Sequence, residues 1–283
     1  MQTLLAAYNS LKESLLTIYN DGEASFIAHE IMEHITGYNK LQRLTKKEEH
    51  FTIEQEAAYT KCSKQLLTGI PMQYVIGHTW FMGHKYIVNS NVLIPRPETE
   101  ELVQLIADDW KNKQDITILD IGTGSGCIPI SLKQLLPQAN VNSCDVSEGA
   151  LSTAQQNAAA LNTDVNFMLL DFLDEIKQAT LKTYDIIVSN PPYIPVEYKE
   201  QMDSNVKDFE PEVALFVPNN DPLLFYRAIA IFGQKYLTPQ GAIYCELHAD
   251  HALATEQLFL EMGYKHVTIK KDMHGNLRIL KAQ

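Results

Sequence analysis

The stretch Ile116-Thr-Ile-Leu-Asp-Ile-Gly-Thr-Gly-Ser-Gly126 joins an apolar run to a glycine-rich loop. The apolar run predicts a buried strand, and the glycines predict a tight turn that opens a helix. Such a loop lets the backbone approach a ligand closely, and the N-terminus of the helix offers free N–H groups. A simpler interpretation, that the glycines only form the turn, stays open at this point.

An acidic residue, Asp145, follows 23 residues after Gly122, at the end of the next expected strand. A carboxylate at that place can accept hydrogen bonds from both ribose hydroxyls of an adenosine cofactor. The loop and Asp145 together fit NAD as well as S-adenosylmethionine. The spacing G-x-G-x-G departs from the dinucleotide fingerprint G-x-G-x-x-G, so it favours S-adenosylmethionine.

Strands and helices alternate through the rest of this region. A helix is expected at residues 148–161, and further strands are expected at residues 140–146, 165–172, 184–189 and 242–247. This βαβ rhythm predicts a doubly wound parallel sheet. The chain ends differently, because residues 266–271 and 277–281 flank a hairpin turn at Met273-His-Gly-Asn276. We therefore expect an antiparallel pair at one edge of the sheet.

The first 70 residues show the three- and four-residue spacing of amphipathic helices. Thr52 and Gln55 form a capping-box signature, Gly37 predicts a helix end, and Gly69 is expected at the C′ position of the helix that follows Thr52. From about residue 79 the period changes to two, which predicts a hairpin with its turn near Gly83. The expected organisation is a helical domain (1–78), a hairpin linker (79–97) and a cofactor domain (98–283).

The motif Asn190-Pro-Pro-Tyr193 stands just past the expected strand 184–189. Ligands of open parallel sheets bind outside the carboxyl ends of the strands, so this motif should face the site. Two prolines fix the backbone and remove two N–H donors, which leaves carbonyl groups free to accept. With the Asn190 side chain as a second acceptor and the Tyr193 ring as a flat surface, the motif suits a planar –NH2 group. A proline-rich turn that only ends a strand is the alternative.

The net charge of −12 lies entirely in residues 98–283, which hold 14 Lys and Arg against 26 Asp and Glu. An acidic domain repels phosphate, which argues against tight non-specific nucleic-acid binding. The apolar fraction of 45% is that of a globular protein, and no run approaches the ~20 apolar residues of a membrane span. We expect no membrane association.

The cysteines stand far apart in the sequence, without a Cys-x-x-Cys pair: Cys62, Cys127, Cys144 and Cys245. Neither a structural zinc site nor a disulfide framework is supported. His248 and His251 could share a helix face, but no further ligand completes a metal site, so no metal is expected. With no signal peptide visible at the N-terminus, a cytoplasmic location is expected.

These motifs together resemble those of the HemK/PrmC family, which methylates a glutamine side-chain amide in peptide chain release factors. Asn-Pro-Pro-Tyr alone is shared with adenine-N(6) DNA methyltransferases, whereas residues 93–100 after a helical domain are far more specific. The resemblance covers most of the chain beyond Gly69. Its segments are Gly69-Ile-Pro-Met-Gln-Tyr74, Phe81-Met-Gly83, Val92-Leu-Ile-Pro-Arg-Pro-Glu-Thr-Glu100, residues 120–126, Asp145-Val-Ser147 with Ala150-Leu151, Val188-Ser-Asn-Pro-Pro-Tyr-Ile194, Glu210-Pro211 and Ala214-Leu215.

The resemblance implies an α/β fold: a class I S-adenosylmethionine-dependent methyltransferase with a Rossmann-like, mostly parallel seven-stranded sheet, an antiparallel edge hairpin and a preceding helical bundle. It implies that the helical domain recognises the release factor. The residues implied to bind the cofactor are Gly122, Thr123, Gly124, Ser125, Gly126, Asp145, Phe172 and Asn190. Those implied to hold the glutamine amide are Asn190, Pro191, Pro192 and Tyr193, with Asn190, Pro191 and Tyr193 catalytic. Residues 96–100 are expected near the methionine end of the cofactor.

The chain departs from the family pattern at three places. Pro129 stands where the family has a small residue, and Pro218-Asn-Asn-Asp-Pro-Leu223 stands where it has a glycine-rich stretch. His251 stands where the family has a glutamine. These departures concern loop detail. Two other functions stay open on the sequence alone. One is an adenine or other nucleic-acid amino methyltransferase that flips its base into the same pocket. The other is a non-catalytic protein that keeps the fold as a scaffold.

Overall fold

The computed structural model describes residues 2–283, which form two compact units. The first comprises the chain up to His78 together with Asp203–Phe209, and the second comprises Thr79–Met202 and Glu210–Gln283. The segment Asp203–Phe209 was not anticipated as part of the helical region. It follows the Asn-Pro-Pro-Tyr motif in the chain but packs with the helices, and its Phe209 ring lies against Gly69.

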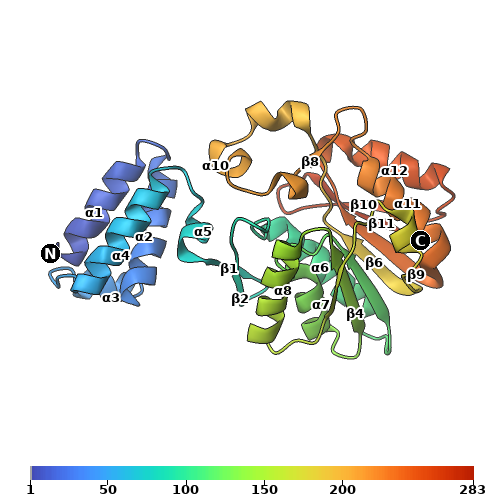
Figure 1. Ribbon diagram of the computed structural model, residues 1–283, viewed down its shortest axis with the longest axis horizontal. Coiled ribbons are helices and arrows are strands. Elements are labelled where there is room, and N and C mark those ends of the chain that lie inside the picture. Colours follow the sequence, from blue (N-terminus) through green and yellow to red (C-terminus); the bar gives the residue numbers. More distant parts are fainter. Residues whose placement is uncertain (1) are drawn as a thin grey trace. The chain divides into compact units, whose positions relative to one another are not determined.

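The first unit is helical (Figure 1). Thr52 caps its helix through the expected capping box with Gln55, and Gly37 ends another at a φ of +70°. The expectation for Gly69 is wrong in detail: that helix ends at Leu66, and Gly69 follows in the connecting turn at a φ of +88°. The helices are α1 (Leu4–Leu15), α2 (Asp21–Thr36), α3 (Lys40–Thr45), α4 (Ile53–Leu66), α5 (Met72–Ile76) and α10 (Ser204–Lys207).

The second unit is built on a seven-stranded sheet of order β10-β11-β9-β6-β3-β4-β5. The five strands from β9 to β5 run parallel, and β11 and β10 add an antiparallel edge, as expected. The strands are β3 (Thr117–Ile121), β4 (Asn140–Asp145), β5 (Asn166–Leu169), β6 (Tyr184–Ser189), β9 (Leu237–Glu246), β10 (Val267–Lys271) and β11 (Leu277–Ala282).

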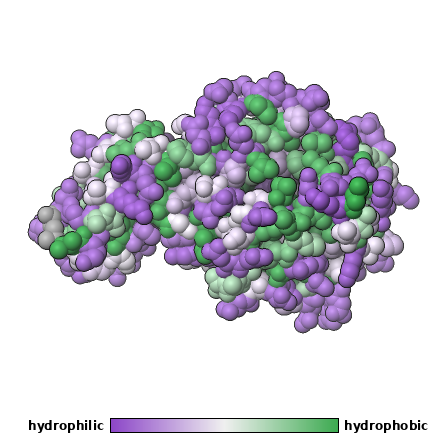
Figure 2. All heavy atoms as spheres, in the orientation of Figure 1, coloured by the Kyte–Doolittle hydropathy of each residue, from purple (hydrophilic) through white to green (hydrophobic). Residues whose placement is uncertain are grey.

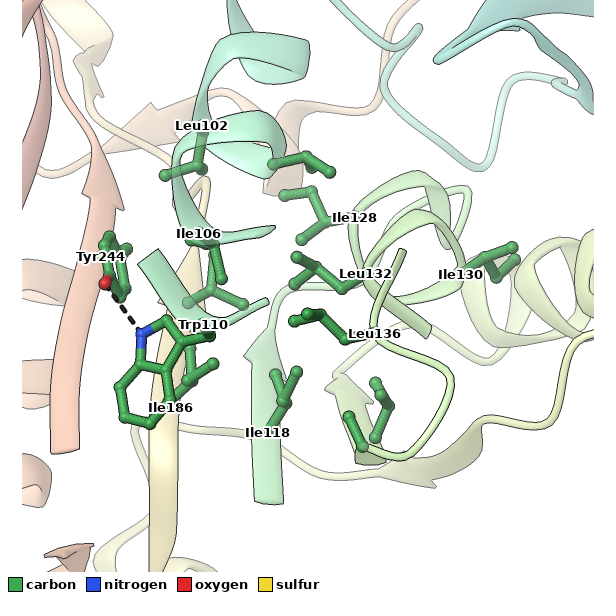
Figure 3. Packing of buried hydrophobic residues seen from close by; sticks show 14 of the residues in the cluster. Leu102, Ile106, Trp110, Ile118, Ile128, Ile130, Leu132, Leu136, Ile186 and Tyr244 are labelled. Carbon is green, nitrogen blue, oxygen red and sulfur yellow. Dashed lines mark hydrogen bonds between the residues drawn. The ribbon is translucent and has the colours of Figure 1, made fainter. Parts of the chain in front are cut away.

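Neighbouring residues of a strand point to opposite faces of the sheet, so apolar side chains lie on both faces. Helices cover both faces and bury these side chains. Ile118 and Ile186 pack under α6 (Pro97–Trp110) and α7 (Cys127–Leu135), as Figure 3 shows, and Trp110 Nε1 donates a hydrogen bond of 2.9 Å to the Tyr244 hydroxyl. Leu119 and the neighbouring β6 and β9 residues pack on the other face. The remaining helices are α8 (Glu148–Ala160), α9 (Glu175–Gln178), α11 (Leu224–Tyr236) and α12 (Ala252–Glu261), with short 3-10 helices η1 (Val196–Gln201), η2 (Glu212–Ala214) and η3 (Ala249–His251).

Two small sheets accompany the main one. The hairpin β1 (His78–Phe81) and β2 (His84–Ile87) turns at Met82 and Gly83, as expected. The second, a parallel pair of β7 (Ile194–Pro195) and β8 (Phe216–Val217), was not predicted. Strand β9 is longer than predicted: its register against β6 jumps from Tyr184↔Leu237 to Ile186↔Ala242, and the residues between include Pro239 and Gly241, which signal a turn in sequence.

Hydrophilic side chains cover much of the visible surface of each unit, and in the second unit hydrophobic residues also gather in patches among them (Figure 2). The most exposed large apolar residues of the helical unit include Leu41, Leu44 and Ile53. Among the described residues, no helix has the length and hydropathy needed to cross a membrane.

Candidate active site

The glycine loop between β3 and α7 has two kinds of glycine. Gly122 and Gly124 have φ values of +79° and +53°, and a Cβ added to either would meet no atom within 4 Å, so both face open space. Gly126, at a φ of +81°, is different: an added Cβ would lie 2.9 Å from Ile130 Cδ1 and 3.0 Å from Ala154 Cβ. The first two glycines can admit a ligand, whereas Gly126 allows α7 and α8 to pack closely.

Asp145, at the end of β4, is fixed beside this loop. Its Oδ2 accepts a hydrogen bond of 2.9 Å from the Gly124 N–H, and its Oδ1 accepts one of 2.9 Å from the Ser147 N–H. Burial raises the pKa of this carboxyl, and the backbone donors oppose the rise. Each carboxylate oxygen keeps acceptor capacity for a further donor, so a pair of hydroxyls fits this side chain.

Behind the loop lies a buried polar floor. Asp120 is fully buried, and its Oδ2 accepts a hydrogen bond of 2.6 Å from Ser143 Oγ. Its Oδ1 is fully enclosed, as are Thr123 Oγ1 and Ser125 Oγ beside the loop. Burial raises the pKa of Asp120 to about 7. The Ser143 and Thr123 hydroxyls oppose this rise, and the Asp145 charge adds to it. These atoms have almost no exposed area, so they form a buried support for the loop.

Asn190 stands at the carboxyl end of β6, next to β3 in the sheet. Ser189 Oγ donates a hydrogen bond of 2.8 Å to the Ile121 carbonyl, which fixes the strand end. The Asn190 Nδ2 group lies 3.4 Å from Thr99 Oγ1, near the start of α6. The amide nitrogen is thus directed to Thr99, and the Oδ1 atom remains to accept from a ligand.

A cavity of about 310 Å³ brings these elements together, all within the second unit. Of the expected site residues, its lining includes Gly122, Thr123, Gly124, Ser125, Asp145, Phe172, Asn190, Pro191 and Pro192. Gly126 and Tyr193 are not among the lining residues. The volume is at the lower end of the range for small-molecule sites, and the mainly apolar lining with a few convergent polar groups is typical of them.

Of the two aromatic residues expected at the site, Phe172 lines the cavity and Tyr193 does not. Phe172 is buried at the cavity wall, with its ring edge-to-face on Phe232 at a centroid distance of 5.2 Å. Tyr193 is half-buried beside the His248 ring, 5.6 Å away. Burial raises the pKa of the Tyr193 hydroxyl, and the nearby Glu246 charge adds to the rise. The hydroxyl therefore stays protonated at neutral pH.

Several lining residues were not predicted as site residues. Asn91, Val92, Leu93 and Pro95 lie in the lining, as do Val213, Ala214 and Phe225. Arg96 and Thr99 line the cavity as well, and they belong to the stretch 96–100 that was expected near the methionine end of the cofactor. Glu210 fixes residues 94–96, because its buried carboxylate accepts from Arg96 Nη2 at 2.6 Å and from the Ile94 N–H at 3.4 Å. Burial raises the pKa of Glu210, and Arg96 opposes the rise. The family-like segments around these residues were the only sequence signal for them.

Comparisons with known proteins agree with this architecture. The model of the PrmC N-terminal domain matches residues 7–77, and that of the methyltransferase small domain matches residues 98–207. A methyltransferase of known structure from Pyrococcus furiosus shares the fold, with a TM-score of 0.52 and 17% identity over 71% of this chain and 89% of the other.

Two curated relatives are much more similar in sequence. A release factor glutamine methyltransferase of Bacteroides thetaiotaomicron is 40% identical over 96% of this chain and 97% of the relative. One of Flavobacterium psychrophilum is 44% identical over 77% of each. The chain belongs to the family of release factor glutamine methyltransferases.

Proposed function

We propose that this protein transfers a methyl group from S-adenosylmethionine to the side-chain amide nitrogen of the glutamine in the Gly-Gly-Gln loop of peptide chain release factors. The observation that carries the proposal is the position of Asn190 and Pro191 in the same cavity as the glycine loop and Asp145. Membership of the family agrees with it. An amide acceptor site beside an adenosine site fits methylation of a planar –NH2 group.

The cavity residues suit the cofactor. Gly122 and Gly124 leave open space for it, Asp145 can accept its ribose hydroxyls, and Phe172 offers an apolar wall to its adenine. S-adenosylmethionine, when bound, supplies an electrophilic methyl group on a positively charged sulfur.

The protein groups around the amide do the positioning. An amide nitrogen is a poor nucleophile because its lone pair is delocalised into the carbonyl group. Asn190 Oδ1 and the Pro191 carbonyl are proposed to accept its two hydrogens, which orients the nitrogen and favours positive charge on it in the transition state. The methylated amide loses its extra proton readily, so no strong general base is required. Pro192 and Tyr193 are proposed to shape the amide pocket.

The release factor itself is proposed to be recognised by the helical unit, and no direct nucleic-acid contact is proposed. The acidic charge of residues 98–283 makes a phosphate backbone a poor neighbour. A transfer assay with labelled S-adenosylmethionine tests the substrate class. We expect label on a release factor, none on its Gly-Gly-Ala variant, and none on DNA or ribosomal RNA. Label on nucleic acid with none on the release factor would contradict the proposal.

A further inference from the structure

A chain of three hydrogen-bonded side chains runs from the cavity lining into the interior, and the proposed reaction uses only its first member, Asn190. Asn190 Nδ2 lies 3.4 Å from Thr99 Oγ1, and Thr99 Oγ1 donates to Glu246 Oε2 at 2.7 Å. They come from the end of β6, the first turn of α6 and the end of β9, and all lie in the second unit. Thr99 and Glu246 are each 2% exposed.

The direction of these hydrogen bonds follows from the chemistry of the groups. An ionised carboxylate can only accept, so it takes the single hydroxyl proton of Thr99. The Thr99 oxygen then has only lone pairs left for its other neighbour. Asn190 must therefore turn its –NH2 group to Thr99, which leaves Oδ1, the acceptor that the glutamine amide requires, for the cavity. A reversed Asn190 amide would present hydrogens to the hydrogens of the substrate.

We propose that Glu246 is a positioning residue that acts through Thr99 to fix the orientation of the Asn190 amide. The proposal rests on the proposed function for its effect on catalysis, but the orientation itself can be measured without a substrate. Glu246 does not line the cavity, and its hydrogen bond to Thr99 links it to Asn190.

The protonation state of Glu246 controls this arrangement. Burial raises its pKa to about 7 and Glu98 adds to the rise, whereas the Thr99 hydrogen bond, Arg278 and Arg96 oppose it. Above that pH the ionised carboxylate accepts the Thr99 hydroxyl proton, which fixes the direction of both hydrogen bonds. Below it the protonated acid can donate to Thr99, which frees the Thr99 proton and permits the reversed amide. The other ionisable groups around Glu246 are Tyr193, Tyr226 and Cys127, and His248 lies beyond Tyr193.

Nuclear magnetic resonance of the full chain labelled with 15N-asparagine tests the orientation directly. The Asn190 side-chain –NH2 signals are assigned by their loss in Asn190→Ala. We expect them to shift with pH around 7 in the wild type and to stop titrating in Glu246→Gln, whose side chain carries no ionisable proton. Signals that do not titrate in the wild type, or that titrate equally in Glu246→Gln, would overturn the proposal.

Kinetics test the consequence. At saturating cofactor and release factor, the turnover of the wild type should decrease by up to tenfold for each pH unit below 7. Glu246→Gln should not show this decrease, which is the acid limb of the pH profile. Thr99→Val should lower kcat about tenfold, the order of one neutral hydrogen bond, with little change in KM, and Thr99→Ser should retain most activity. An unchanged acid limb in Glu246→Gln would contradict the role of Glu246.

Thr153→Val is the matched control. Thr153 is 1% exposed and accepts a hydrogen bond of 3.1 Å from Asn89 Nδ2, but it does not line the cavity. Equal losses of kcat in Thr99→Val and Thr153→Val would reduce the effect of Thr99 to general destabilisation and overturn the proposal. If the wild type methylates no release factor at any pH, the proposed function fails, while the titration of Asn190 still decides the orientation.

Discussion

The two ends of the cavity are built in different ways. The end proposed to bind the cofactor uses residues 120–147, where backbone N–H groups of Gly124 and Ser147 hold Asp145 within one βαβ unit. The end proposed to bind the amide is held by side chains distant in sequence: Thr99 with Asn190 and Glu246, and Arg96 with Glu210. Local backbone geometry therefore forms the first end, and tertiary packing of separate elements forms the second.

The largest effect is expected at the amide end. Asn190→Ala removes the acceptor proposed for one amide hydrogen, so kcat should fall at least ~100-fold, as the loss of a preorganised hydrogen-bond partner commonly produces. Affinity for S-adenosylmethionine should change much less, which calorimetry measures. A folded Asn190→Ala enzyme with a near-normal single-turnover rate would remove Asn190 from the mechanism.

At the cofactor end, the expected effect is on affinity. Asp145→Ala leaves the ribose hydroxyls without a charged acceptor, which should weaken binding of S-adenosylmethionine by about 1.5 to 3 kcal/mol. The Gly124 and Ser147 N–H groups lose their partner as well, so the urea midpoint of unfolding should be compared in parallel. Unchanged affinity in the folded variant would place the ribose elsewhere.

The glycines of the loop separate binding from packing. In Gly126→Ala, the added Cβ meets Ile130 and Ala154, so we expect a loss of folding stability of about 1 to 3 kcal/mol from overpacking, beyond the backbone strain of its positive φ. In Gly122→Ala only the backbone strain applies, about 1 to 2 kcal/mol, while the new methyl group stands in the cavity. Cofactor affinity should fall more in Gly122→Ala, and stability more in Gly126→Ala; the reverse ranking would contradict these assignments.

This difference between the ends also decides how far the sequence could predict the site. The order of strands and helices and the positions of Gly122, Asp145 and Asn190 follow from local patterns, and the structure has them at one sheet edge. The partners of Asn190 do not follow from such patterns, because Thr99 lies 91 residues away from it and no periodicity links them. The same holds for Arg96 and Glu210, which are 114 residues apart.

Tyr193 illustrates the same limit. Its place in the Asn-Pro-Pro-Tyr motif suggested a flat surface for the amide, but the described side chain packs against His248 and does not line the cavity. We predict that Tyr193→Phe is the mildest change, with a smaller loss of kcat than Thr99→Val, because the ring packing is kept and Tyr193 does not line the cavity. A large loss in Tyr193→Phe, measured by steady-state kinetics, would show that the hydroxyl contributes directly.

Mass spectrometry of a release factor incubated with the protein and S-adenosylmethionine tests the central claim most directly. We predict one added methyl group, located by fragmentation on the side chain of the Gly-Gly-Gln glutamine, with the wild type and almost none with Asn190→Ala. A methyl group on another residue, or an unmodified glutamine after prolonged incubation with a folded, cofactor-binding wild-type enzyme, would contradict the account.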